Sequence, residues 1–437
     1  TDFLTPFRTA LQAIQTHAPL EAGAEAIKIY YRLHPDGRLR WIWPAGLNKP
    51  LFLKCYYEGS LRSKWIGRLI RMLFAMRLGR WFATGEHTLH ISTLSSQSIQ
   101  QQLGNQWAFF AGTPGVHQSA VFYTQQTQSF IKIPIGQEAC QLMKKEYIRL
   151  MQTNQASFRY LVVPRVSGSD KMMMQTDLSV KRKRSERIGT PHWKAMGELA
   201  CCQTSRQPLQ QWHGWTRIRE TLQNLPWHDE RFPKGLFSKL NWLANQIDSS
   251  ASISCSLAHG DFTPWNVFVS KEQLGVIDWE QASDSMPLFF DMYHFIYQQS
   301  SLVSSDSYNR LLKKIEQALK HPVARVLEEE HRVQRELHHR LYLLYIISYY
   351  LPVYQRQSNW HPQVYQSLRI WSDALTHQLS QVPSIPHRSL LLLDMFDFLG
   401  RSNYAALKWR TGNPADLPVT SDVDLCMPNA EAKCLLR

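Results

Sequence analysis

The stretch "LAHGDFTPWNVFV", Leu257 to Val269, decides how the rest of the chain is interpreted, because it places several polar side chains directly before a run of strand formers. Phosphoryl transfer requires in-line positioning, metal ions on the phosphates and a carboxylate near the attacking hydroxyl. Asp261 is a candidate to accept the hydroxyl proton, and Asn266, five residues later, offers an amide oxygen to a magnesium ion. The stretch therefore predicts a phosphoryl-transfer loop.

A second magnesium ligand is expected close to Asn266, because this ion prefers several oxygen ligands. The segment "LGVIDWE", Leu274 to Glu280, supplies Asp278 at the end of a short run of strand formers. Asp278 follows Asn266 by twelve residues. At this spacing a two-strand hairpin would return Asp278 to the same site.

These two segments resemble the catalytic loop and metal-binding segment of the aminoglycoside phosphotransferase and choline kinase family, small-molecule kinases of the protein-kinase-like fold. The resemblance implies that Asp261 is the catalytic base, that Asn266 and Asp278 bind magnesium, and that His259 supports the loop. It also implies ATP and Mg²⁺ as cofactors. The implied fold is α+β and two-lobed, with a small β-rich N-lobe and a larger, mostly helical C-lobe.

The segment after the metal aspartate departs from the family pattern. In "SDSMPLFFDMYHF" the chain keeps Pro287 and Asp291 but lacks the usual glycine.

The region before the loop offers an independent check, since a kinase of this type needs a strand lysine for the phosphates and a helix glutamate to orient it. Lys132 lies in "SFIKIPI", the third of three strand-like runs. Glu146 follows on a helical run as the better ion-pair candidate, and Glu138 is the alternative or a helix-start residue. Gly112 and Gly115 loosely resemble the family's phosphate-covering turn.

The domain organisation follows from these assignments. Asp422 and Asp424 alternate on one predicted strand face, which is similar to the start of a nucleotidyltransferase-type domain that binds magnesium. Whether this pair is functional or a fragment is left open. The expected regions are an accessory region at 1–105, the N-lobe at 106–178, the C-lobe at 179–395 and the nucleotidyltransferase-like segment at 396–437.

The segment from Leu61 to Phe82 predicts a basic amphipathic helix. The basic side of this segment carries Lys64, Arg68 and Arg71, and beside it runs an apolar stripe formed by Trp65, Leu69, Met72, Leu73 and Met76. Packing of this stripe on a core is the favoured interpretation, and contact with an anionic membrane surface is the alternative.

Charge and composition narrow the classes of partner. Lys plus Arg exceed Asp plus Glu by 49 to 35, a net charge of +14 that favours an anionic partner such as a nucleotide, a phospholipid surface or a nucleic acid, without distinguishing among the three. The densest basic run, "KRKRSER" at 181–187, is interpreted as a solvated linker or helix face, and no specific nucleic acid is expected as a partner. No apolar run reaches the roughly 18 residues of a membrane span, and the scattered cysteines lack metal-ligand spacing. A cytoplasmic location is therefore expected.

The predicted function is an ATP- and Mg-dependent phosphotransferase acting on a hydroxyl of a small molecule or a sugar or glycan, in a setting such as surface-polysaccharide synthesis. A nucleotide-binding pseudokinase scaffold at a membrane is the alternative. Near-balanced charge between residues 281 and 386 favours a sugar over a polycationic aminoglycoside. Four aromatic residues are candidates to stack on the acceptor or to belong to the core: Tyr345, Tyr349, Trp360 and Trp371. The acceptor, the choice between ATP and GTP, and the oligomeric state stay open.

Overall fold

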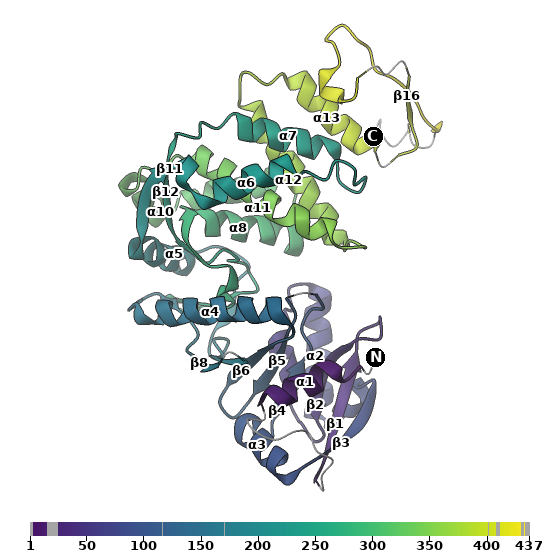
Figure 1. Cartoon of the computed structure of the whole chain (residues 1–437), viewed down its shortest axis with the longest axis vertical. Coiled ribbons are helices and arrows are strands. Elements are labelled where there is room, and N and C mark those ends of the chain that lie inside the picture. The colour runs from purple at the N-terminus through teal and green to yellow at the C-terminus, as the bar shows by residue number, and fades with distance from the viewer. Residues whose placement is uncertain are drawn as a thin grey trace. The chain divides into compact units, whose positions relative to one another are not determined.

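The computed structural model of the chain describes residues 3–14, 25–115, 117–169, 171–400, 402–407, 411–429 and 432. It divides into two compact units (Figure 1). Unit 1 comprises Thr1–Glu186 and Asp261–Ala282, and unit 2 comprises Arg187–Gly260 and Ser283–Arg437. Unit 1 is rich in strands and unit 2 is mostly helical. The two-lobed α+β class expected from the sequence is thus confirmed.

Unit 1 is built on an eight-stranded sheet with the order β3-β1-β2-β4-β5-β6-β9-β8. The pairings from β3 through to β8 are antiparallel. Lys132 lies on β6, opposite Val121 of β5 and Met173 of β9. The strands are β1 (Glu25–Leu33), β2 (Leu39–Pro44), β3 (Gly85–Ile91), β4 (Trp107–Phe110), β5 (Ser119–Thr124), β6 (Ser129–Pro134), β8 (Val166–Ser169) and β9 (Met172–Thr176).

The first hundred residues extend this sheet, so the compact units do not follow the region boundaries expected from the sequence. The predicted hairpin forms β1 and β2, and β2 then pairs with β4 through Trp41 opposite Phe110. Local alternation of apolar residues reveals a hairpin, but it does not reveal which distant strand the hairpin joins. Strands β1, β2 and β3 of the N-terminal region therefore belong to the same sheet as the strand that carries Lys132.

Alternating side chains give this sheet two packed faces, as expected for a period of two residues. On one face Phe122 and Ile42 belong to a core cluster with Phe7 of α1 (Thr5–Ile14) and Leu103 of α3 (Thr93–Leu103). On the other face a second cluster surrounds the indole of Trp43. Both faces of the central strands are therefore packed, whereas the outer strands β3 and β8 have exposed positions.

The second cluster contains Trp43, Phe52 of the 3₁₀ helix η1 (Leu51–Cys55), and Ile70 and Phe74 of α2 (Leu61–Ala75). The predicted helix is present, but the expectation that its named stripe packs on the core is wrong. Four members of that stripe are exposed and Leu73 is half-buried. The sequence offers two apolar sides, and the aromatic residues of β2 and η1 contact the side that carries Ile70 and Phe74.

Helix α4 (Gln137–Gln155) begins after Gly136, whose φ of 99° turns the chain from β6 into the helix. Its buried side carries Ala139, Met143, Glu146 and Leu150, spaced by three or four residues. Glu146 is therefore carried into the interior by the periodicity of its own helix.

A smaller sheet in unit 1 contains the predicted hairpin after the catalytic loop. Its order is β10-β13-β14-β7, and β13 pairs with β14 through Val267 opposite Val276. The hairpin expected from the spacing of Asn266 and Asp278 is present. The strands are β7 (Leu161–Val162), β10 (Lys183–Arg184), β13 (Val267–Ser270) and β14 (Gln273–Val276).

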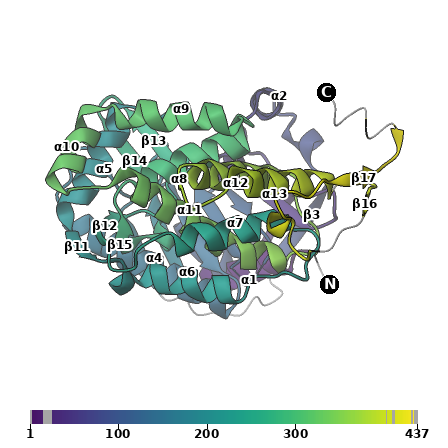
Figure 2. The same ribbon diagram turned by 90° about the horizontal axis from the view of Figure 1, so that it is seen from above.

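Unit 2 is a helical assembly with a three-stranded sheet, β11-β12-β15, that the sequence did not reveal in full. Helices α7, α12 and α13 lie side by side (Figure 1, Figure 2). The strands are β11 (Thr204–Pro208), β12 (Ser252–Ala258) and β15 (Ser283–Pro287), with a separate pair β16 (Ala405–Leu407) and β17 (Asp424–Cys426). The helices are α5 (Thr190–Cys202), α6 (His213–Gln223), α7 (Lys234–Asn245), α8 (Phe290–Gln298), α9 (Tyr308–Leu319), α10 (Pro322–Glu330), α11 (Arg335–Gln355), α12 (Pro362–Ser380) and α13 (His387–Leu399).

No helix in the described part of the chain is both long enough and apolar enough to cross a membrane.

Buried histidines make the stability of unit 2 sensitive to acid. Burial lowers the pKa of His339 from 6.5 to about 3 and that of His192 to about 4. The neutral ring of His339 forms hydrogen bonds with Tyr297 and Gln378. The neutral ring of His192 accepts a hydrogen bond at Nδ1 from the backbone N–H of Gly189. Because the pKa is lower in the folded state, this stability is present above pH 6.5 and is lost as pH falls below it.

We expect the free energy of unfolding to decrease by roughly 2 to 3 kcal/mol between pH 7 and pH 5.5, since each histidine contributes at most about 1.4 kcal/mol per pH unit. Urea unfolding at a series of pH values measures this change. His339→Gln should reduce the slope between these pH values, whereas His90→Gln, at an exposed position of β3, should not. Equal slopes in all three proteins would contradict the assignment.

Candidate active site

The side chain of Lys132 forms an ion pair with Glu146 across the interface of β6 and α4. Lys132 Nζ lies 2.7 Å from Glu146 Oε2, and the Glu146 side chain is only 1% exposed. The other oxygen of Glu146 accepts a hydrogen bond from Gln175 Nε2 of β9 at 2.8 Å. Glu138, the alternative partner considered from the sequence, lies in the first turn of α4 with an exposed side chain. The lysine and glutamate are thus arranged as in protein kinases.

Two further carboxylates lie beside this pair. Lys132 Nζ is 3.6 Å from Asp278 Oδ1 and 3.1 Å from Glu280 Oε2. Within the described ranges, Glu146, Asp278 and Glu280 form a group that could hold a metal ion, with carboxylate oxygens that all lie within 4.8 Å of one another. Glu280 was not assigned a role from the sequence, although its position two residues after Asp278 was the available signal.

The backbone of Asp278 is in the left-handed region, with φ 68° and ψ 66°, and the 3₁₀ helix η4 (Trp279–Gln281) follows it. A non-glycine residue in this conformation is uncommon, and such residues are frequent at functional sites. Burial raises the pKa of Asp278 to about 8, with further contributions from Glu280, Glu146 and Asp261, while Lys132 opposes the shift. A bound cation would favour the ionised form of this carboxylate.

Asp261 and Asn266 are joined by hydrogen bonds within the catalytic loop. Asn266 Nδ2 donates to Asp261 Oδ2 at 2.9 Å and to the backbone carbonyl of Asp261 at 3.1 Å. The N–H of Ile277 donates to the carbonyl of Asn266 at 3.0 Å, which closes the open end of the β13–β14 hairpin. This bond lies next to Asp278 in the chain. The hairpin therefore places the backbone of Asn266 beside that of Ile277, the residue before Asp278.

His259 is fully buried in unit 2, at the end of β12. The backbone N–H of His259 donates to Asp291 Oδ2 at 2.8 Å, and the backbone N–H of Gly260 donates to Asp291 Oδ1 at 3.0 Å. Burial raises the pKa of Asp291, against the opposing effects of His259 and these two backbone hydrogen bonds. Asp291 on α8 thus fixes the backbone immediately before Asp261, although the glycine of the family pattern is absent from the segment that carries it.

Gly112 and Gly115 lie in the loop between β4 and β5. Gly112 has φ +78°, and a Cβ atom there would come within 2.1 Å of the carbonyl oxygen of Ser119. Gly115 has φ +150° and open space around it. Gly112 is therefore required by the close approach of its own loop, whereas Gly115 faces open space.

Arg184 connects the N-terminal region to the catalytic loop. Its guanidinium donates to the carbonyl of Trp265 at 3.1 Å and to that of Tyr56 at 3.0 Å, and it lies over the rings of Tyr57 and Phe268. Within "KRKRSER", the interpretation as a solvated linker is thus wrong for Arg184, because two backbone carbonyls and two rings surround it. Burial lowers the pKa of Arg184 from its usual value.

The donor set fits magnesium. Asp278 and Glu280 provide carboxylate oxygens and Asn266 provides an amide oxygen, and Mg²⁺ is bound in proteins by such oxygens together with water and substrate phosphates. Asn266 is almost completely buried, and its amide nitrogen already donates to Asp261. The residues present therefore suit a magnesium ion carried by a nucleotide.

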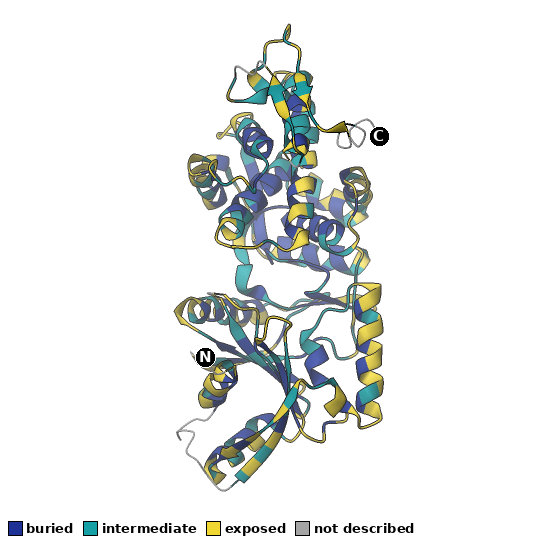
Figure 3. Cartoon of the chain, turned by 90° about the vertical axis from the view of Figure 1, so that its right-hand side faces the viewer, coloured by how far each residue is buried: buried dark blue, intermediate teal, exposed yellow. Residues whose placement is uncertain are grey.

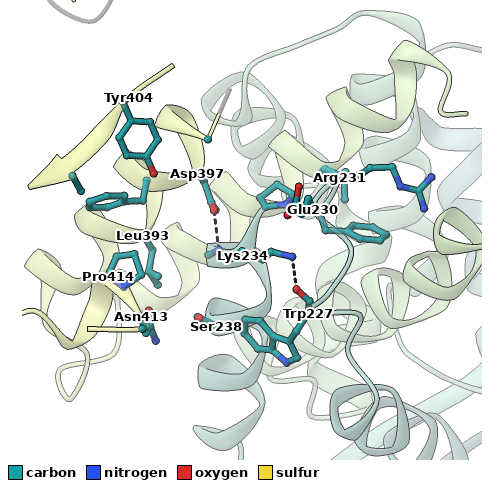
Figure 4. Close-up of a pocket in the computed structure, with 18 of the residues that line it drawn as sticks. Trp227, Glu230, Arg231, Lys234, Ser238, Leu393, Asp397, Tyr404, Asn413 and Pro414 are labelled. Atoms are coloured by element: carbon teal, nitrogen blue, oxygen red, sulfur yellow. Dashed lines mark hydrogen bonds between the residues drawn. The ribbon is translucent and has the colours of Figure 1, made fainter. Parts of the chain in front are cut away.

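A separate cavity of about 960 Å³ lies within unit 2, between α7, α13 and the segment that contains β16 (Figure 4). Trp227, Lys234, Asp397 and Tyr404 are among its lining residues. Gly235 donates its N–H to Asp397 Oδ1 at 2.8 Å, and Lys234 Nζ donates to the carbonyl of Trp227. None of the catalytic or metal residues predicted from the sequence lines this cavity.

Residues 152–297 match the model of the "Phosphotransferase enzyme family". The match covers about a third of the chain and includes Asp261, Asn266 and Asp278, but not Lys132 or Glu146. The resemblance predicted from the sequence is thus confirmed over this segment. No curated protein matches the chain significantly.

Several solved structures are similar to the chain at low identity. An ADP-bound aminoglycoside phosphotransferase is 14% identical, with a TM-score of 0.39, over 63% of this chain and 95% of that one. A choline kinase from Streptococcus pneumoniae is 14% identical, with a TM-score of 0.38, over 64% and 97%. An ethanolamine kinase from Plasmodium vivax is 11% identical, with a TM-score of 0.41, over 66% and 90%. These likenesses are too weak to assign a substrate.

Proposed function

We propose that the chain is a kinase that transfers the γ-phosphoryl group of Mg-ATP to a hydroxyl of a small molecule or sugar. The observation that carries the proposal is the formed Lys132–Glu146 ion pair with Asp278 beside it. A nucleotide-binding scaffold has no need for a catalytic base, so the Asp261 carboxylate that Asn266 holds in the same loop favours a kinase. The family match over the catalytic loop supports the same conclusion.

Each residue has a distinct role in this proposal. Lys132, oriented by Glu146, binds the phosphates of ATP, and Asp278 and Asn266 bind magnesium. Magnesium, when bound, neutralises charge that develops on the phosphates. Asp261 orients the acceptor hydroxyl and takes its proton, and the hydrogen bond from Asn266 holds its carboxylate in place. Gly115 gives the β4–β5 loop room to approach the phosphates.

Glu280 is proposed to complete the metal site. Its carboxylate lies 3.1 Å from Lys132 Nζ and belongs to the same group of carboxylates as Asp278. When no metal is present, the contact with Lys132 neutralises the charge of the Glu280 carboxylate. The regions 106–178 and 179–395 are kept in this proposal as the sequence segments that carry the catalytic residues, although the compact units divide the chain differently.

The acceptor is proposed to be a sugar or glycan hydroxyl, and a quaternary amine is disfavoured. Among the aromatic candidates, Trp371 is buried in the core, and Arg217 already lies over Tyr345 and Tyr349, with its guanidinium 4.8 Å from the Tyr349 ring centre. Arg231 lies in the same way over Trp360, at 4.8 Å. Rings that face a guanidinium are unsuited to enclose a second cation.

A place in surface-polysaccharide synthesis depends on the C-terminal Asp422 and Asp424. Both are exposed, and Asp424 pairs with Leu407 across β16 and β17. They are not part of the carboxylate group of unit 1. This role stays a prediction.

Replacing Asp278 with asparagine tests the metal site. We expect the gain in ATP affinity that magnesium provides to fall roughly tenfold or more, because one anionic ligand of the ion is removed. Calorimetric titration of ATP at increasing magnesium concentration measures the change. Asp284→Asn, at an exposed position of β15, is the matched control and should bind as the unaltered protein does. Unchanged magnesium dependence in Asp278→Asn would refute the proposed site.

A further inference from the structure

Helix α2 and the turn that follows it present a row of large apolar side chains to solvent. Trp65 is 68% exposed, Leu69 52% and Trp81 72%. Leu61, Ile66, Met72 and Met76 are also exposed. In Figure 3, α2 is the upright helix at the right edge, and its outward side is yellow. We call the exposed side chains of residues 61–81 the α2 face.

The α2 face carries positive charge without acidic residues of its own. Residues 61–82 contain no Asp or Glu. They contain six basic residues, namely Arg62, Lys64, Arg68, Arg71, Arg77 and Arg80. Two of these are paired with acidic residues from neighbouring segments, Lys64 with Glu186 and Arg71 with Glu58. The remaining four arginines give the face a net positive charge.

The opposite side of α2 is firmly held by unit 1. Ile70 and Phe74 belong to the core cluster around Trp43, and Ser60 caps the first turn by accepting the N–H of Ser63 at 3.1 Å. The helix is thus folded and oriented without help from its exposed side. A preformed amphipathic helix loses little conformational entropy when it binds a surface.

We propose that the α2 face docks on an anionic lipid surface. Apolar side chains flanked by arginines, with a tryptophan near each end of the segment, suit the boundary between lipid headgroups and acyl chains. A helix of 15 residues spans about 22 Å, which is too short to cross the hydrocarbon core of a bilayer. Because its opposite side is packed on unit 1, the helix would lie in the plane of the surface. The absence of acidic residues between 61 and 82 favours anionic lipid over a protein partner of mixed charge.

This proposal is independent of the proposed catalytic activity, because none of the proposed catalytic or metal residues lies on the α2 face. Docking would explain the exposure of Trp65 and Trp81, which is costly in water.

Co-sedimentation of the whole chain with vesicles tests the docking. We expect binding to an equimolar mixture of phosphatidylcholine and phosphatidylglycerol, little binding to phosphatidylcholine alone, and weaker binding as salt is raised from about 0.1 to about 0.5 M. Leu69→Asp should reduce binding at least tenfold, because it places an anion within the α2 face. Leu94→Asp, at an exposed position of α3 in the same unit, should leave binding unchanged.

Three results would overturn the proposal: no binding to the anionic vesicles, equal binding to both kinds of vesicle, or equal loss of binding in Leu69→Asp and Leu94→Asp. Self-association of the unaltered protein that Leu69→Asp abolishes, without vesicle binding, would show instead that the α2 face contacts a second copy. Far-ultraviolet circular dichroism shows whether both variants are folded. Magnesium-dependent ATP binding by the unaltered protein is measured in parallel, and its absence would count against the proposed function and not against docking.

Discussion

Replacing Asp261 with asparagine is expected to reduce phosphoryl transfer by roughly a hundred- to ten-thousand-fold, the range that a positioned general base contributes. The asparagine retains a carbonyl oxygen that can still accept from Asn266, and Asn266 also donates to the backbone carbonyl of residue 261. The loop should therefore keep its shape while its base is lost. Magnesium-dependent ATP binding should stay within about twofold of the unaltered protein, since neither Lys132 nor Asp278 is changed.

Single-turnover measurement of phosphate transfer, beside calorimetric ATP binding, separates these two effects. Glu272→Gln is the matched control, because it neutralises an exposed carboxylate between β13 and β14 in the same part of the chain. It should leave both transfer and binding unchanged. Near-normal transfer by Asp261→Asn would show that this carboxylate is not the base.

Replacing Lys132 with methionine is expected to destabilise unit 1 and to weaken ATP binding together. Burial lowers the pKa of Lys132, but the carboxylates of Glu146, Asp278 and Glu280 outweigh this effect and raise it well above its usual value. Methionine keeps much of the side-chain volume but leaves Glu146 buried without its cation. Breaking a buried pair in this way costs roughly 3 to 5 kcal/mol.

The matched control is Lys28→Met, which breaks the Lys28–Glu86 ion pair on β1 and β3 of the same sheet. That pair has a similar distance of 2.9 Å, but both its side chains are at least half exposed. Exposed pairs contribute about 0 to 1 kcal/mol. Urea unfolding should therefore separate the two variants clearly, and adding Glu146→Gln to Lys132→Met should recover part of the loss. Equal stability of the two single variants would contradict the assignment of Lys132 and Glu146 as a stabilising buried ion pair.

The parts of the site that the sequence predicts are those formed by local chain segments. Asn266 and Asp278 flank a hairpin with a short turn, so their spacing is sufficient to predict that the chain returns from one to the neighbourhood of the other. Lys132 and Glu146 lie on a strand and on the helix that follows it, and the periodicity of α4 turns Glu146 inward. In both cases the pattern and the three-dimensional contact depend on the same few residues.

The rest depends on contacts between distant segments, which periodicity does not specify. The pairing of β2 with β4 merges the first hundred residues with the sheet that carries Lys132. Arg184 meets the carbonyl of Tyr56, 128 residues away in the chain. The outward direction of Trp65 and Leu69 depends on Trp43 and Phe52 packing against the opposite side of α2. A sequence with two apolar helix sides does not show which side is buried.

The proposed kinase activity is tested by transfer of labelled γ-phosphate from Mg-ATP to a panel of sugars, glycan extract, amino alcohols and aminoglycosides. We expect a labelled product with a sugar or glycan acceptor, and we expect this product to disappear when magnesium is removed. Absence of product across the panel, from a protein that binds ATP in a magnesium-dependent way, would contradict the kinase proposal and favour a nucleotide-binding scaffold.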